Sequence, residues 1–240
     1  MYMNRTKELD EYFFENINNE KTAYFLGLMY SDGNVLKNKI WNSSLISLTQ
    51  NVKNKELVYE FQKALKTNRK ITFNKKYNAY TLSVNSNILF EDLEKWGVVP
   101  NKSLTLKFPT FISDDLMPHF IRGYFDGDGS IWDGKRKKML VKNEKKPGTM
   151  RERIVHNVKF NFTGSETFIP DLQNYLIEHC GFTKTKLNYS KSKTEHKHCM
   201  LEYSGRKNVY KLYEYMYSNA TIFSKIKKQK FNKIIEYEKS

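Results

Sequence analysis

Two aspartates occupy the same place in two copies of one short pattern, FLGLMYSDG at 25–33 and IRGYFDGDG at 121–129. Each copy is an apolar stretch that ends in Asp-Gly, at Asp32 and Asp128. The stretches predict helices, so each carboxylate would lie at a carboxyl end that already carries partial negative charge. Two such carboxylates close together repel each other, and a divalent cation removes the conflict. Hard oxygen ligands suit Mg²⁺, Ca²⁺ or Mn²⁺ better than zinc.

The two patterns also share an internal glycine, Gly27 and Gly123. A glycine inside a helix costs about 1 kcal/mol relative to alanine, so its repeated placement indicates close approach by another helix. We expect the two helices to pack together about a pseudo-twofold axis, with Asp32 beside Asp128. A pair of metal ions there would serve phosphodiester hydrolysis. The alternative is that Asp-Gly only forms a turn after each helix, which the duplication disfavours.

The elements around the two patterns recur in the same order. In the first half we expect, in order, a helix from about Thr22 to Asp32, a strand at 45–50, a helix at 55–66, strands at 70–76 and 80–86, and a helix at 88–97. In the second half we expect a helix capped by Ser113 and ending at Asp128, a strand at 158–163, a helix at 167–181, strands at 184–190 and 199–204, and a helix at 208–218. The chain therefore reads as one unit used twice, 1–109 and 110–240.

The second half is longer than the first in one place, near 134–153. That segment carries nine Lys or Arg and two Glu. A charge run of this kind is often only a solvated loop. Because the whole chain is basic, we favour a phosphate-binding loop or extended hairpin, with Lys135, Arg136, Lys137 and Lys138 as candidate DNA contacts.

Composition limits the classes of protein to consider. Lys and Arg number 41 against 26 Asp and Glu, a formal charge of +15, which favours nucleic acid over a membrane surface as partner, although some proteins are simply basic. The apolar fraction of 39% can fill a packed core. No stretch is apolar enough for a signal peptide or a membrane span, so we expect a soluble intracellular protein of the cytoplasm or an organelle matrix.

The two cysteines, Cys180 and Cys199, are too few for a disulfide framework and are expected to be reduced thiols. The run Glu-His-Lys-His-Cys at 195–199 has the residue types of a metal cluster. Its alternation is also that of a polar hairpin, which we favour.

Sheet residues that face away from the core are the other candidate DNA contacts. Apolar residues such as Ile46 and Phe160 alternate with polar neighbours along the strands. A polar and basic sheet face suits a nucleic-acid groove, although exposure to solvent gives the same alternation. The candidates are Ser47, Thr49, Lys70, Thr72, Asn74, Thr81 and Ser83 in the first half and Lys159, Asn161, Thr163, Lys186, Asn188 and Ser190 in the second.

Both patterns resemble the motifs of LAGLIDADG homing endonucleases, in the single-chain form with two motifs. PNKSLTLKFP at 100–109, leading into PHFIRGYFDGDGS at 118–130, is especially similar to the linker and second motif of these proteins. The resemblance covers nearly the whole chain, because the order of elements around each motif also matches.

The resemblance implies a monomeric α+β protein of two pseudo-symmetric αββαββα repeats, with the motif helices at the interface and two antiparallel sheets forming a saddle over DNA. Family members cut both strands of a long pseudo-palindromic double-stranded target. Their metals, here expected to be Mg²⁺ with Mn²⁺ as a substitute, are bound by the last acidic residue of each motif, Asp32 and Asp128. Tyr30 replaces an earlier motif aspartate that is not a metal ligand, and the backbone at Ser31 is given no metal role.

Family members also place a basic residue near the metals. Lys102 lies 15 residues after Asn87, and Lys225 lies 17 residues after Asn208, so these lysines are the candidate catalytic pair. Each could instead be a phosphate contact or an ordinary surface charge.

A polar residue that organises water is the remaining family feature. Gln50, at the end of the strand at 45–50, is the candidate in the first half. The matching position in the second half is Gly164, with Thr163 and Ser165 beside it, so the role there is open.

The leading hypothesis is a Mg²⁺-dependent, sequence-specific DNA endonuclease of the mobile-element type. The alternative is a binding protein that does not cleave, either an RNA maturase acting on intron RNA or a DNA-binding regulator on the same scaffold. Both motif acids are present, which favours cleavage. The nuclease portion of an intein is less favoured, because no splicing segment flanks the repeats in this sequence.

Overall fold

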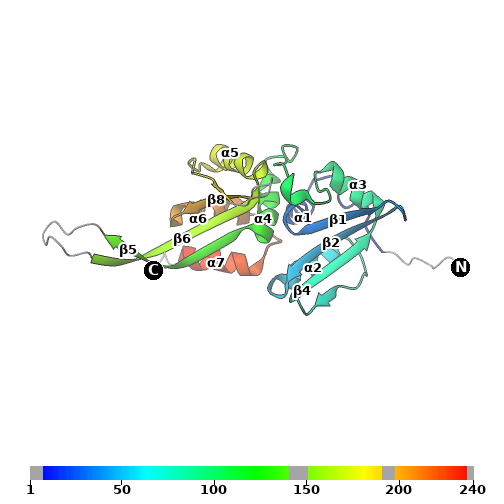
Figure 1. Cartoon of the computed structure of the whole chain (residues 1–240), viewed down its shortest axis with the longest axis horizontal. Helices are drawn as coiled ribbons and strands as arrows, with labels where there is room; N and C mark the ends of the chain where they lie inside the picture. Colours follow the sequence, from blue (N-terminus) through cyan, green and yellow to red (C-terminus); the bar gives the residue numbers. More distant parts are fainter. Residues whose placement is uncertain (1–7, 141–150, 191–197, 237–240) are drawn as a thin grey trace.

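The computed structural model describes residues 8–140, 151–190 and 198–236 (Figure 1). Its first repeat contains α1 (Glu20–Ser31), β1 (Gly33–Asn38), β2 (Ser43–Asn51), α2 (Lys55–Ala64), β3 (Thr72–Asn74), β4 (Ala79–Asn85) and α3 (Asn87–Lys95). The second repeat contains α4 (Met117–Asp128), β5 (Ser130–Leu140), β6 (Arg151–Ser165), α5 (Phe168–Cys180), β7 (Asn188–Tyr189), β8 (His198–Ser204) and α6 (Arg206–Tyr217). A last helix, α7 (Lys225–Glu236), follows.

The two repeats have the same topology. Each has a four-stranded antiparallel sheet, ordered β1-β2-β4-β3 in the first and β5-β6-β8-β7 in the second. The sheets lie on opposite sides of the central α1 and α4 helices (Figure 1). The expected α+β fold of two αββαββα repeats is therefore confirmed, with α7 as an addition. The boundary between 109 and 110 stays a prediction, and it falls in the connection between α3 and α4.

Glycine lets the motif helices approach each other closely. A Cβ on Gly27 would lie 2.1 Å from the Phe120 carbonyl oxygen, and a Cβ on Gly123 would lie 2.0 Å from the Tyr24 carbonyl oxygen. Neither position has room for a methyl group. The predicted packing of the two motif helices, and the reason for their glycines, is confirmed.

Alternation along the strands separates a buried face from an open one in each sheet. Ile46, Leu48, Phe160 and Phe162 are all at most 1% exposed and belong to the main core. In the first repeat, α2 and α3 pack on this buried side of the sheet, and in the second α5 and α6 do. The opposite faces are left for the polar residues.

Some predicted boundaries are wrong. Ser113 does not cap α4: its carbonyl oxygen accepts the N–H groups of Leu116 and Met117 in a preceding turn, and the helix begins at Met117 with Pro118 in its first turn. Proline fits that position because the first helical N–H groups have no intrahelical partner. The strand expected at 184–190 is reduced to Asn188–Tyr189.

The basic insertion is a hairpin in its described part. β5 and β6 remain paired from Ser130 with Asn161 as far as Leu140 with Arg151, and 141–150 lie outside the described residues. The run at 195–199 is also a hairpin arm where it is described, since Tyr189 pairs with Cys199. Both cysteines are free thiols. Among the described residues, no helix is both long and apolar enough to cross a membrane.

Candidate active site

The two motif aspartates meet where α1 and α4 end. Asp32 is the C-cap of α1, and Asp128 is the last residue of α4. A Cβ on Gly127 would lie 2.8 Å from Asp32 Oδ2 and 1.9 Å from Ser31 Oγ, so glycine at 127 lets the first carboxylate press against the second helix. Gln50 Nε2 donates to Asp32 Oδ2 at 2.6 Å. The structure therefore brings together Asp32, Asp128 and Gln50.

The electrostatics of the site reflect this crowding. The Asp128 side chain is partly open to solvent. The surrounding protein still removes water from its carboxyl group, and this burial, followed by the charge of Asp32, raises the pKa of Asp128 to about 6. Burial likewise raises the pKa of Asp32, although the Gln50 hydrogen bond, Lys227 and Lys102 oppose the shift. Two carboxylates with raised pKa values constitute a site that a cation would stabilise.

A lysine lies near the aspartate pair on each side, Lys102 buried and Lys227 half-buried. Lys102 lies in a short 3₁₀ turn, Lys102–Leu104, and its Nζ donates to the carbonyl oxygens of Ser31 and Gly33. Burial lowers its pKa, while the charges of Asp128 and Asp32 oppose the change. The sequence-based placement of Lys102 next to both carboxylates agrees with the structure.

The lysine near the aspartate pair in the second half is Lys227 rather than the expected Lys225, and a catalytic role for either lysine stays a prediction. Lys227 Nζ donates to the carbonyl oxygens of Phe125, Asp126 and Gly127, at the carboxyl end of α4. Burial lowers its pKa to about 8, against the charges of Asp126, Asp32 and Asp128. Lys225 is exposed at the start of α7. Two residues along a helix turn the side chain by about 200°, so only one of these lysines can face the site.

The second half has no counterpart of Gln50 among the described residues. Gln50 pairs with Tyr80, and Gly164 occupies the equivalent ladder position opposite Cys199. A Cβ on Gly164 would lie 2.4 Å from the Tyr124 hydroxyl, which itself donates to the Thr163 carbonyl oxygen. The Tyr124 ring therefore takes the space that a side chain at 164 would need.

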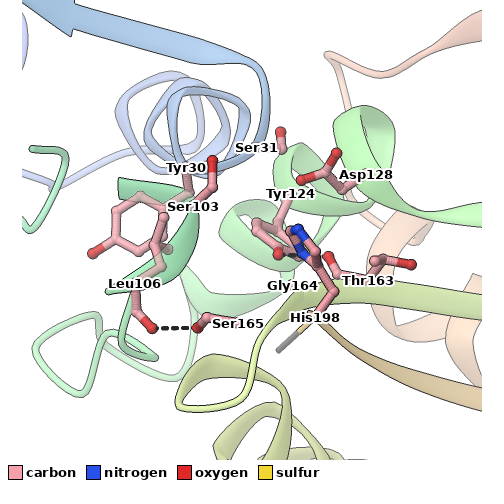
Figure 2. Close-up of a pocket in the computed structure, with 10 residues that line it drawn as sticks. All are labelled: Tyr30, Ser31, Ser103, Leu106, Tyr124, Asp128, Thr163, Gly164, Ser165 and His198. Atoms are coloured by element: carbon pink, nitrogen blue, oxygen red, sulfur yellow. Dashed lines mark hydrogen bonds between the residues drawn. The ribbon is translucent and has the colours of Figure 1, made fainter. Parts of the chain in front are cut away.

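A small cavity of roughly 190 Å³ lies at this place in the second half. Figure 2 shows Asp128, Ser31, Tyr124 and His198 among the residues that line it. Ser165 does not take the polar role, because its Oγ donates to the Leu106 carbonyl oxygen and accepts the Phe168 N–H. His198 is near enough for its charge to lower the pKa of Asp128, whereas the sequence placed this residue only in a polar hairpin arm and not at the site.

The polar residues of the first sheet share its open face. Ser47 pairs with Ser83 and Thr49 with Thr81, and the Thr49 and Thr81 hydroxyl oxygens are 2.8 Å apart. Thr72 also pairs with Thr81. Two further candidates lie at the edge: Lys70 is exposed before β3, and Asn74 Oδ1 accepts the N–H groups of Lys76 and Tyr77 in the β3–β4 turn.

The candidates of the second sheet are more varied in their surroundings. Lys159, Asn161 and Thr163 alternate with core phenylalanines along β6, and Lys159 forms an ion pair of 2.7 Å with Glu202. Asn188 is exposed in β7 and Lys186 precedes it, whereas Ser190 Oγ accepts the His198 N–H at 3.2 Å. The backbones of Lys135, Arg136, Lys137 and Lys138 lie in β5.

The donor set fits Mg²⁺ or a similar hard cation. No cluster of three or more His, Cys, Asp or Glu is present among the described residues, so the protein offers two carboxylates rather than a complete cage. Mg²⁺ usually takes one or two carboxylates and completes its octahedron with water and substrate phosphate oxygens. Asp32 and Asp128 would hold it.

Solved structures share this fold. The structure resembles the LAGLIDADG meganuclease I-AabMI bound to uncleaved DNA (TM-score 0.61, 15% identity, 92% of each chain) and the LAGLIDADG homing endonuclease I-LtrWI bound to target DNA (TM-score 0.60, 15% identity, 92% of each chain). It also resembles meganuclease I-CpaMI bound to uncleaved DNA (TM-score 0.57, 12% identity, 91% of this chain and 90% of that one). No family model matches the sequence, and a search of curated proteins gives no match. The chain has the two-repeat fold of the LAGLIDADG homing endonucleases.

Proposed function

We propose that the chain is a homing endonuclease, a sequence-specific enzyme that hydrolyses both strands of double-stranded DNA with divalent metal ions. The observation that carries the proposal is the pair Asp32 and Asp128, set at the contact of two equivalent helices and flanked by two polar sheet faces. An aspartate pair at a pseudo-twofold axis can serve two strands of opposite direction. The neighbours of the same fold, bound to DNA in their solved structures, support this reading.

The residues of the site have separable tasks in this proposal. Asp32 and Asp128 hold Mg²⁺, which when bound acidifies water and stabilises a leaving oxygen. Gln50 fixes the orientation of the Asp32 carboxylate through its hydrogen bond. Lys102 and Lys227 bring positive charge to the carboxyl ends of the helices, where the scissile phosphates would lie.

The target is a long, pseudo-palindromic DNA duplex, because two similar but unequal sheets would read two similar but unequal half-sites. The open face of the first sheet offers hydroxyl and amide groups that can contact base edges, and the second sheet adds Lys159 and the basic hairpin for phosphates. A monomer suffices, since both halves of the site are present in one chain.

A library of random DNA sequences tests the function whatever the target site is. The library would be enriched for binding in Ca²⁺, incubated with Mg²⁺, and sequenced at newly formed ends. We expect paired ends at one site family with Mg²⁺ or Mn²⁺ and none with EDTA. Tight binding without any double-strand ends in Mg²⁺ or Mn²⁺ would instead indicate a DNA-binding regulator.

A further inference from the structure

Arg122 is a fully buried cation in the second motif helix. Its side chain is 0% exposed. Nε donates to the Ile222 carbonyl oxygen at 2.8 Å, and one terminal nitrogen donates to the Met216 carbonyl oxygen at 2.6 Å and lies 3.0 Å from His119 Nδ1. The other terminal nitrogen is 2.7 Å from Glu20 Oε1. The guanidinium thus joins α4 to the end of α6, to the segment before α7 and to α1.

Glu20, the first residue of α1, binds the same segment from the other motif helix. Its carboxylate accepts the N–H and the hydroxyl group of Thr221, both at 2.7 Å, and the N–H of Ile222 at 3.2 Å. Glu20 and Arg122 together therefore make five hydrogen bonds with Met216, Thr221 and Ile222.

Asp126 holds the next segment of the chain, directly before α7. Its Oδ2 accepts the Tyr24 hydroxyl at 2.8 Å and the Ser224 N–H at 2.6 Å. Ser224 directly precedes α7, and its carbonyl oxygen accepts the N–H of Lys228 in that helix. Three residues later, Lys227 reaches back to the carbonyl oxygens of α4.

We propose that Glu20, Arg122 and Asp126 are positioning residues that fix the start of α7 and thereby hold the Lys227 ammonium beside the aspartate pair. The consequence for catalysis rests on the proposed function, whereas the positioning of Lys227 does not. A buried ion pair adds little net stability compared with apolar side chains of similar size. Its directional hydrogen bonds do define the path of the segment that they hold.

The first half holds the segment before its lysine by a different contact. Tyr30 takes the position equivalent to Asp126, and its hydroxyl donates to the Trp96 carbonyl oxygen. Lys102 begins a short 3₁₀ turn in the connection that follows α3. Lys227 instead stands in a separate helix whose placement depends on the segment after α6.

The test replaces both partners of the ion pair, Glu20→Met together with Arg122→Met, so that no unpaired charge is buried. The matched control is Glu60→Met with Lys63→Met, an exposed ion pair on α2. The first readout is acylation of Lys227 by an amine-reactive ester, measured by peptide mass spectrometry with Lys225 as internal reference. The others are thermal unfolding, DNA binding in Ca²⁺ and single-turnover cleavage in Mg²⁺.

We expect Lys227 acylation relative to Lys225 to differ several-fold from wild type in the first double variant, because release exposes the amine and also returns its pKa from about 8 toward 10.5. In the control the ratio should stay at the wild-type value. Cleavage should fall about a hundredfold, the usual cost of a catalytic group displaced by an ångström, while binding in Ca²⁺ is retained. Unchanged acylation of Lys227 in a folded variant would overturn the proposal. If the double variant does not fold, Glu20→Gln, which keeps the side-chain size, is judged by the same acylation ratio. Should the wild-type protein cleave no DNA, the acylation result still decides the positioning role, and only the proposed function fails.

Discussion

Lys102 and Lys227 occupy equivalent positions on the two sides of the aspartate pair, although one lies in a 3₁₀ turn and the other in an α-helix. Lys102 Nζ donates to carbonyl oxygens at the end of α1, and Lys227 Nζ donates to carbonyl oxygens at the end of α4. Each ammonium group neutralises part of the negative helix terminus to which an aspartate has been added. The two lysines therefore reduce the same electrostatic repulsion, between the aspartates and the negative helix ends, from opposite sides.

Removal of one ammonium group should reduce cleavage far more than DNA binding. For Lys227→Met we expect the single-turnover rate to fall about a hundredfold or more, the scale seen when one preorganised charge or donor is removed from a transition state. The matched control is Lys225→Met, on the same helix but exposed. Equal rates for the two variants would show that Lys227 has no catalytic role.

The sequence was sufficient for the fold and the aspartate pair because both depend on periodic or repeated signals. Gly27, Gly123, Asp32 and Asp128 recur at fixed spacing, and the structure places them as expected. Lys225 was chosen by counting from Asn208, which assumes that the two halves keep the same length after their last helices.

That assumption fails because Lys102 lies seven residues beyond the end of α3 at Lys95, whereas Lys227 lies ten residues beyond the end of α6 at Tyr217. The lysine that reaches the site is selected by long-range contacts of Glu20, Arg122 and Asp126, which no local pattern reveals. His198 was predicted only as part of a polar hairpin arm, because the pairing of β6 with β8, which sets it opposite Ser165 and near Asp128, is a long-range contact as well.

Replacement of the motif carboxylates should separate binding from cleavage. We expect Asp32→Asn and Asp128→Asn each to abolish double-strand cleavage while leaving DNA affinity in Ca²⁺ within a few-fold of wild type. Without metal, the free energy of unfolding of each variant should be unchanged or higher by less than about 1 kcal/mol, because solvent screens the repulsion between the two carboxylates. Asp171→Asn, at an exposed site on α5, is the control. Cleavage by either motif variant would contradict the metal assignment.

Metal binding should weaken in mild acid. The pKa of Asp128 is raised from 3.8 to about 6, so the folded protein binds this proton more tightly than the unfolded chain does. Without metal, the cost of the charged form is present above about pH 6 and disappears as the pH falls to 3.8. A metal ion competes with the proton, so Mn²⁺ affinity should fall up to about tenfold per pH unit below about pH 6. Titration calorimetry between about pH 5 and 8 measures this, and an affinity independent of pH would exclude Asp128 as a ligand that titrates in this range.

Because the two motif helices are in contact, alanine in place of their internal glycines should destabilise the protein rather than stabilise it. In an ordinary helix Gly→Ala stabilises by about 1 kcal/mol. Here a methyl group at Gly27 or Gly123 would lie within 2.1 Å of a carbonyl oxygen of the facing helix, so the helices must separate. We expect Gly27→Ala and Gly123→Ala to lower the free energy of unfolding by about 1–3 kcal/mol in urea titrations, as overpacking does. A gain in stability would mean that the helices are not in contact in solution.

The basic hairpin should bind DNA phosphates in a way that depends on salt. Because Gly134 pairs with Asn157, residues 135–156 can be replaced by a two-residue Asn-Gly turn without disturbing the rest of β5 and β6. The replacement removes nine Lys or Arg and two Glu. Each phosphate that the protein no longer neutralises should lower the slope of log affinity against log salt by about 0.9, so a clear decrease is expected in Ca²⁺. The control keeps the hairpin length and removes only four of its charges, by changing Lys135, Arg136, Lys137 and Lys138 to glutamine. If both variants keep the wild-type slope, the hairpin does not touch the DNA backbone; if only the short variant changes, the phosphates are bound by charges beyond 138.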